Sequence, residues 1–144
     1  MEITTNISEV IESFAKKNEE IDKAIELATS RVAMLAVREM KNQIVGRHAP
    51  GTPRSEGKNI VAGRPSNVTD NLRRSIYSTT RRGFGGSYTA IVGPGAGYAY
   101  ALEVTGVGKA QTRYPFVGPT ATIMSESGRA SSIYEDAMRR VFGK

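Results

Sequence analysis

The residue types that most often perform chemistry are sparse in this sequence and stand far apart. His48 is the single histidine, cysteine is absent, and the adjacent acids Glu135 and Asp136 point in different directions on a predicted helix. Acyl transfer needs a base beside its nucleophile, and zinc or calcium needs several ligands in one place. We therefore expect no catalytic residue, no metal site and no cofactor, and we interpret His48 as a solvent-exposed loop residue.

Two other features invite a chemical interpretation. The glycine-rich stretch 93–97 lacks the Gly-Lys-Ser/Thr of a nucleotide-binding loop, and no helix is predicted directly after it, so a turn between strands is the better interpretation. Glu103 follows the apolar run 98–102 and is the only acid between Asp70 and Glu126. We expect its carboxylate to form a salt bridge with a nearby arginine.

Charge is placed unevenly along the chain. The net charge of +6 divides into 6 − 8 = −2 over residues 1–45 and 14 − 6 = +8 over residues 46–144. A basic block contacts nucleic acid, an acidic protein surface or only water. The stretch 46–82 holds eight bases, which are our candidates for an interface or a DNA channel: Arg47, Arg54, Lys58, Arg64, Arg73, Arg74, Arg81 and Arg82.

Residues 6–45 are predicted to form one long amphipathic helix. Asn6 and Glu9 resemble a capping pair at its start, and Gly46 ends it. We expect its apolar stripe to pack on the chain's own sheet or, in part, on a neighbouring subunit. The stripe recurs at steps of three and four, with Asn18 as its one polar interruption, at Ile7, Ile11, Phe14, Ile21, Ile25, Ala28, Val32 and Leu35.

The rest of the chain predicts a small sheet and a closing helix. Residues 46–68 show no periodicity and are expected to be a long basic loop that stays flexible until a partner orders it. One helical turn capped by Thr69 follows. We then expect a hairpin of strands 75–81 and 87–92 around the turn 83–86, a short strand or helical turn at 98–104, a loop at 106–113, and a helix near 130–142.

These elements predict a single α+β domain over residues 1–144: a long N-terminal amphipathic helix, a small antiparallel β-sheet within 69–144, and a C-terminal helix. Its longest apolar runs are too short to cross a membrane, and the first residues do not resemble a signal peptide. The absence of cysteine fits a reducing compartment.

Four short segments stand in a distinctive order: Leu72-Arg73-Arg74-Ser75-Ile76, Val92-Gly93-Pro94, Tyr98-Ala99-Tyr100-Ala101-Leu102-Glu103, and Tyr114-Pro115-Phe116-Val117-Gly118-Pro119-Thr120-Ala121. An amphipathic helix and the step His48-Ala49-Pro50 precede them. In this outline the chain resembles the neck, or tail-completion, family of long-tailed double-stranded DNA bacteriophages, also described as minor tail components. It departs from the family pattern at Thr69-Asp70-Asn71, at Glu103-Val104-Thr105-Gly106, and in the greater length of loop 46–68.

The resemblance implies a structural virion protein of the head–tail junction, made in the host bacterial cytoplasm. Several copies would form a ring-shaped homo-oligomer between the portal-side connector or head-closure proteins and the tail-terminator or tail-tube proteins, near the packaged DNA and away from any membrane. Phe116 is expected to anchor the C-terminal segment in the core, and Glu103 to pair with a base. The positions carried over from the family pattern are Arg73, Arg74, Tyr98, Glu103, Pro115, Phe116 and Pro119.

Two alternatives stay open. A tail-terminator ring that caps the tail tube is a neighbouring role that the sequence does not separate from the neck. A free nucleic-acid-binding protein would instead use the basic block 46–82 for phosphate contacts, with Tyr77, Phe84 and Tyr88 stacking on bases.

Overall fold

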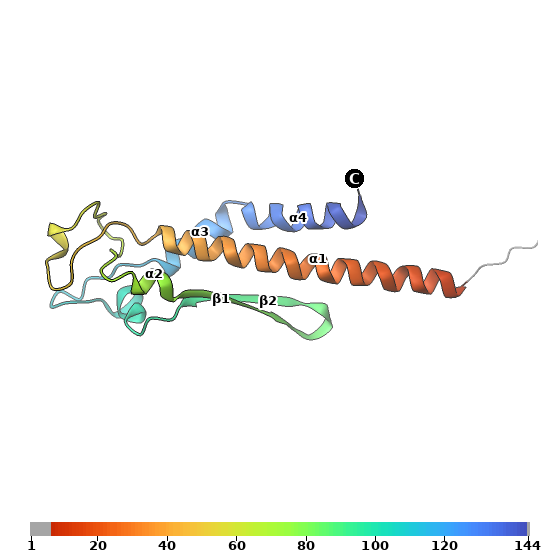
Figure 1. Cartoon of the computed structure of the whole chain (residues 1–144), viewed down its shortest axis with the longest axis horizontal. Coiled ribbons are helices and arrows are strands. Elements are labelled where there is room, and N and C mark those ends of the chain that lie inside the picture. Colours follow the sequence, from red (N-terminus) through yellow and green to blue (C-terminus); the bar gives the residue numbers. More distant parts are fainter. Residues whose placement is uncertain (1–6, 144) are drawn as a thin grey trace, which may run out of the picture.

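The molecule is built along one long helix, with a β-hairpin on one side of it and a shorter helix on another (Figure 1). The computed structural model describes residues 7–143, so the predicted capping pair of Asn6 and the Glu9 side chain lies outside the described residues. The predicted α+β class is confirmed. The elements are α1 Ile7–Asn42, α2 Asn71–Ser75, β1 Ile76–Arg82, β2 Tyr88–Pro94, a π-helical turn Ala101–Thr105, α3 Val117–Glu126 and α4 Arg129–Phe142.

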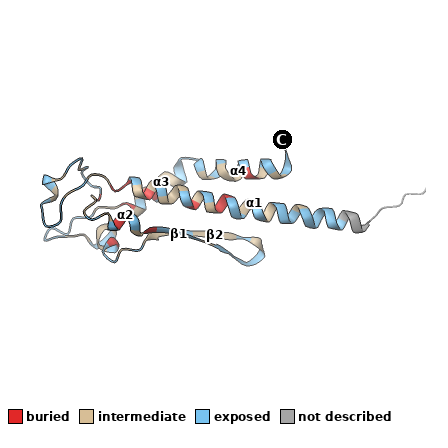
Figure 2. Ribbon diagram, viewed as in Figure 1, coloured by how far each residue is buried: buried red, intermediate tan, exposed pale blue. Residues whose placement is uncertain are grey.

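Helix α1 follows the prediction closely but ends three residues earlier, at Asn42. Its central and C-terminal turns bury Ala28, Ala33 and Met40, whereas its first turns extend beyond the other elements (Figures 1 and 2). Gly46 then redirects the chain with a φ of 80°. A Cβ at this position would lie 2.5 Å from the Asn59 carbonyl oxygen, so only glycine fits the turn.

The predicted hairpin is confirmed, with each strand shifted by one or two residues. Strands β1 and β2 pair in antiparallel register from Ile76↔Pro94 to Arg82↔Tyr88, and both pack on α1. Because side chains alternate across a strand, the face that carries Ile76 turns toward α1 and the face that carries Tyr77 is exposed. The hairpin is the whole sheet in the part of the chain that the structure describes.

Two local predictions need correction. Asp70, not Thr69, holds the N-cap position of α2, with a φ of 64° and no side-chain bond to the helix. Residues 99–105 are helical, the last five as the π-helical turn, so the strand alternative for 98–104 is wrong. The predicted C-terminal helix is confirmed as α4, and Gly128 at φ 69° separates it from a further helix, α3.

The core is a small cluster at the end of α1 nearest α2. Phe116 is its largest member and is 0% exposed. Within residues 7–143 no helix is both long and apolar enough to span a lipid bilayer. The cluster joins α1 to the hairpin and to the start of α3 through Met40, Ile44, Leu72, Ile76, Ala99 and Phe116.

Candidate functional site

The four segments that carry the family resemblance converge on the core. Leu72 and Ile76 come from the first segment, Ala99 from the third and Phe116 from the fourth, and Val92 of the second packs against them. Phe116 anchors the C-terminal segment, as expected. The shared residue pattern of these segments therefore has a structural reason, since they meet around one aromatic side chain.

We had expected the Glu103 carboxylate to form a salt bridge with an arginine. It bonds to backbone N–H groups instead. The carboxylate accepts hydrogen bonds from three consecutive backbone N–H groups, those of Phe116 at 2.8 Å, Val117 at 3.0 Å and Gly118 at 2.8 Å. These donors lie at the N-terminus of α3, where the helix dipole favours a negative charge. Glu103 is thus a helix cap supplied from a distant turn.

The sequence around α3 explains why it needs a distant cap. No side chain at the N-cap position Phe116 bonds to the helix. Pro119 has no N–H, and the Thr120 N–H already donates to the Phe116 carbonyl at 3.3 Å. Glu103 therefore satisfies the donors that remain. The missing local cap, together with an isolated acid upstream, is the sequence signal that would have identified this contact.

Loop 46–68 makes several contacts among its own residues and one with Tyr114. The Arg54 guanidinium donates to the Ser66 hydroxyl at 2.8 Å and to the carbonyls of Val61, at 2.8 Å, and Arg64. It also lies over the Tyr114 ring, 4.4 Å from the centroid. Backbone bonds between Arg47 and Lys58, at 2.7 and 2.9 Å, close the loop further.

His48 is likewise held, which corrects its interpretation as an exposed loop residue. Its Nδ1 lies 2.9 Å from the Ser66 hydroxyl, the same group that accepts from Arg54, and the side chain is only partly exposed. Among the described residues, no group of three His, Asp or Glu side chains is placed to hold a metal ion.

We expect Arg54→Lys to loosen this loop without unfolding the domain. Lysine carries one compact ammonium and cannot span three acceptors while stacking on Tyr114. Hydrogen bonds to charged groups contribute about 1.5–3 kcal/mol, so amides of segment 54–66 should exchange with deuterium roughly tenfold faster or more. Arg64→Lys is the matched control, because the side chain of Arg64 is exposed. Unchanged exchange in Arg54→Lys would contradict this role for the guanidinium.

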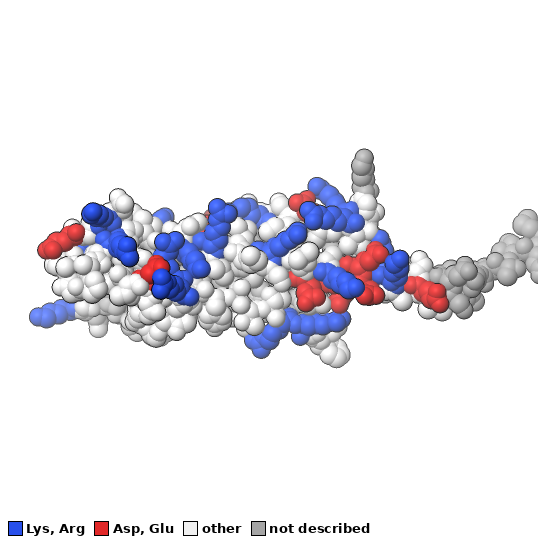
Figure 3. Space-filling view, in the orientation of Figure 1, with Lys and Arg blue, Asp and Glu red and all other residues white. Residues whose placement is uncertain are grey.

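The eight basic candidates do not form one patch. Arg54 is used within the loop, Arg74 lies 3.3 Å from Asp70, and Arg82 lies 3.0 Å from Asp22. Arg82 lies beside the middle of α1 at Asp22, whereas the loop bases follow the end of α1 at Asn42, about 30 Å away at 1.5 Å per helical residue. The other five candidates are exposed: Arg47, Lys58, Arg64, Arg73 and Arg81. Figure 3 shows basic side chains spread over the visible face, with acids gathered on the side of the N-terminal half of α1.

Asp70 gives this region a pH dependence. A hydrogen bond from the Asn67 side chain at 2.7 Å, followed by nearby arginines, lowers the pKa of Asp70. A carboxyl with a lowered pKa in the folded state stabilises the fold above its ordinary pKa and loses that contribution as the pH falls through the lowered value. We expect Asp70→Asn, which tolerates the positive φ, to be less stable than the unaltered protein at pH 7. The difference in urea midpoint should shrink at pH 3. A difference that is constant with pH would contradict this.

The main feature that sequence reasoning missed is the amount of apolar surface left uncovered. Twelve large apolar side chains are exposed among the described residues. They are Ile11, Phe14, Leu27 and Met34 on α1, Tyr77 and Ile91 on the hairpin, Phe84 at its tip, Tyr98, Tyr100 and Val104 around the π-helical turn, Val61 in the loop and Phe142 on α4.

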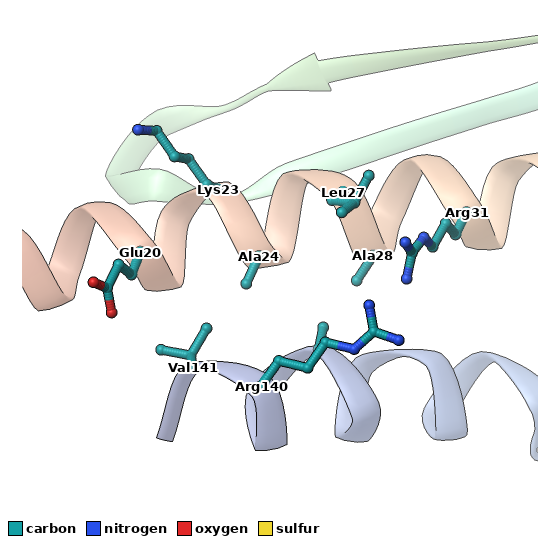
Figure 4. A pocket seen from close by; sticks show the side chains of 9 residues that line it. Glu20, Lys23, Ala24, Leu27, Ala28, Arg31, Arg140 and Val141 are labelled. Atoms are coloured by element: carbon teal, nitrogen blue, oxygen red, sulfur yellow. The ribbon is translucent and has the colours of Figure 1, made fainter. Parts of the chain in front are cut away.

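Two of these surfaces have distinct shapes. Phe84 is fully exposed on a glycine-rich hairpin tip. On another side of α1, an open groove of about 470 Å³ runs between α1 and α4. In Figure 4, Arg31 and Arg140 extend from the two helices toward the same gap, and Val141 faces the α1 turn that carries Ala24. The groove is lined by Glu20, Lys23, Ala24, Leu27, Ala28, Arg31, Ala137, Arg140 and Val141.

The exposed apolar side chains and the groove between α1 and α4 are suited to binding other protein chains through apolar contacts. Comparison of the chain with family models, with curated proteins and with solved structures finds no match.

Proposed function

We propose that this protein is a structural subunit of the phage head–tail junction, a member of a neck or tail-completion ring that joins the portal-side connector to the tail. The observation that carries the proposal is the set of large apolar side chains that stay exposed on α1, the hairpin, the π-helical turn and α4, among them Phe14 at 66% and Met34 at 69%. Contiguous exposed apolar surface on a folded chain marks contact with other macromolecules. Repeated subunits are one way to cover it on several sides.

The family resemblance supports the phage assignment. Its apolar positions are explained by the core around Phe116, and Glu103 is explained by the capping of α3. Motif residues that the core does not use remain on the surface, namely Arg73, Arg74, Tyr98 and Tyr100. These are the motif positions that we assign to contacts with neighbouring subunits.

We infer that the protein works by assembly and carries out no reaction. His48, the only histidine, is engaged with Ser66, and Glu103 with backbone donors. The exposed bases either line the channel through which DNA passes or contact acidic partners. Bases that are spread over the surface suit DNA that slides past, because they do not concentrate phosphate contacts in one place.

Deletion of the gene from its phage tests the proposal. We expect filled heads and separate tails in negative-stain images, with infectivity restored by the gene supplied in trans. Joined and infectious particles without the protein would overturn the proposal. Tails of uncontrolled length would instead assign the terminator role.

The nucleic-acid alternative has its own test. A free DNA-binding protein would bind duplex DNA at physiological salt, with an affinity that falls steeply as salt rises. We expect no such binding by the purified chain, measured by fluorescence anisotropy.

A further inference from the structure

We propose that the first turns of α1 of one copy dock in the groove between α1 and α4 of a second copy. The inference rests on the proposed ring, because it names the contact between neighbouring subunits. It follows from three features of the described chain: an uncovered end of α1, an open groove with an apolar floor, and opposite charges on the two.

The uncovered end of α1 carries the continuation of its apolar stripe. Ile11 is 61% exposed and Phe14 is 66% exposed, although the stripe packs inside the molecule from Ile21 onward. Helix α4 ends level with Lys17, whose ammonium donates to the Val141 carbonyl and lies 5.3 Å from the Phe142 ring centroid. The turns before Lys17 therefore have no α4 beside them, as Figure 1 also shows.

The groove has an apolar floor. Its floor is made of small or aliphatic side chains, and small residues allow two helix axes to approach closely. An amphipathic helix that lays its apolar residues into such a groove is a common mode of protein recognition. The floor residues are Ala24, Leu27, Ala28, Ala137 and Val141.

Charge complementarity selects this occupant. Of the charged residues that line the groove, Lys23 pairs with Glu19 and Glu20 pairs with Lys17, whereas Arg31 and Arg140 extend toward the gap and give it a charge of +2. The uncovered turns before Lys17, residues 7–16, carry the acids Glu9 and Glu12 and the base Lys16, which gives 1 − 2 = −1. The hairpin tip fits less well despite its exposed Phe84, because it brings two further arginines, 81 and 82, to a basic wall.

The occupant must come from another copy. Segment 7–16 and one wall of the groove belong to the same continuous helix α1, so a single chain cannot fold one onto the other. A contact between two different surfaces leaves the pair with one free helix end and one free groove, and repetition of such a contact gives a ring when the rotation between neighbouring copies closes.

Disulfide trapping tests the contact, since the chain has no cysteine of its own. One preparation carries Ala15→Cys, beside Phe14, and the other carries Ala24→Cys in the groove. Docking raises the effective concentration of the two thiols to about millimolar, so oxidation of the mixture should give about tenfold more mixed dimer than an undocked pair. Thr79→Cys, on the outer face of the hairpin, replaces Ala24→Cys in the control mixture.

Adding Phe14→Ser to the Ala15→Cys chain should reduce the trapped dimer to the control level. Phe14 is exposed, so this change leaves the subunit folded, which circular dichroism checks.

Equal trapping in the test and control mixtures would overturn the contact, and so would a yield that Phe14→Ser leaves unchanged. This result is separable from the phage experiment. Unjoined heads and tails in the deletion strain, with no trapped dimer, would retain the neck function and reject the contact. A trapped dimer with normal deletion particles would retain the contact and reject the function.

Discussion

Phe116→Ala is expected to destabilise the protein by about 3–5 kcal/mol, which is a large part of the roughly 5–15 kcal/mol that holds a typical domain together. Phe116 is 0% exposed and fills the centre of a small core, where four sequence segments meet on α1. Its removal leaves a cavity that few neighbours can fill, because the remaining core members are Met40, Ile44, Leu72, Ile76 and Ala99. Urea unfolding followed by far-ultraviolet circular dichroism measures the loss.

Phe84→Ala is the matched control for this prediction. It removes the same side chain from the hairpin tip, where Phe84 is fully exposed. Surface substitutions of this kind change stability by less than about 0.5 kcal/mol. Equal destabilisation by the two variants would contradict the placement of Phe116 at the centre of the core.

Glu103→Ala is expected to have the second largest effect, a loss of about 2–3 kcal/mol. Alanine leaves the N–H groups of Phe116, Val117 and Gly118 without their acceptor and removes the negative charge from the N-terminus of α3. Glu103→Gln keeps one neutral acceptor oxygen and should lose about half as much. Urea midpoints and deuterium exchange of the first turn of α3 measure both effects.

Glu126→Gln controls for the charge itself. Glu126 is exposed and is the last residue of α3, where the helix dipole disfavours an acid. Its neutralisation should leave stability unchanged or raise it slightly. A loss like that of Glu103→Ala would show that net charge, and not the cap, decides the stability.

The regular elements were predictable because their signals are local. The stripe from Ile21 to Leu35 has the period of a helix, and the glycine-rich turn at 83–86 lies between two β-rich runs, so α1 and the hairpin appear within a few residues of their expected bounds. The closing helix also lies where its apolar spacing placed it, at Arg129–Phe142.

The contacts that hold the irregular segments were not predictable, because each joins distant residues. The Arg54 guanidinium contacts the ring of Tyr114, sixty positions away (114 − 54), and no local sequence pattern indicates that contact. Glu103 reaches thirteen positions to Phe116. The exposure of Ile11 and Phe14 was also not predictable, because the same apolar stripe continues into the packed turns of α1. Only the length of α4 shows which turns of α1 it covers.

We propose above all that the exposed apolar side chains of this chain are buried against other protein chains, in a ring at the head–tail junction. A cryo-electron reconstruction of that junction in intact virions tests it most directly. We expect several copies around the DNA channel, with the start of α1 from each copy covered by the α1–α4 groove of its neighbour and Phe84 buried against protein. A junction into which no copy of this chain fits, or copies whose apolar side chains face solvent, would contradict the account.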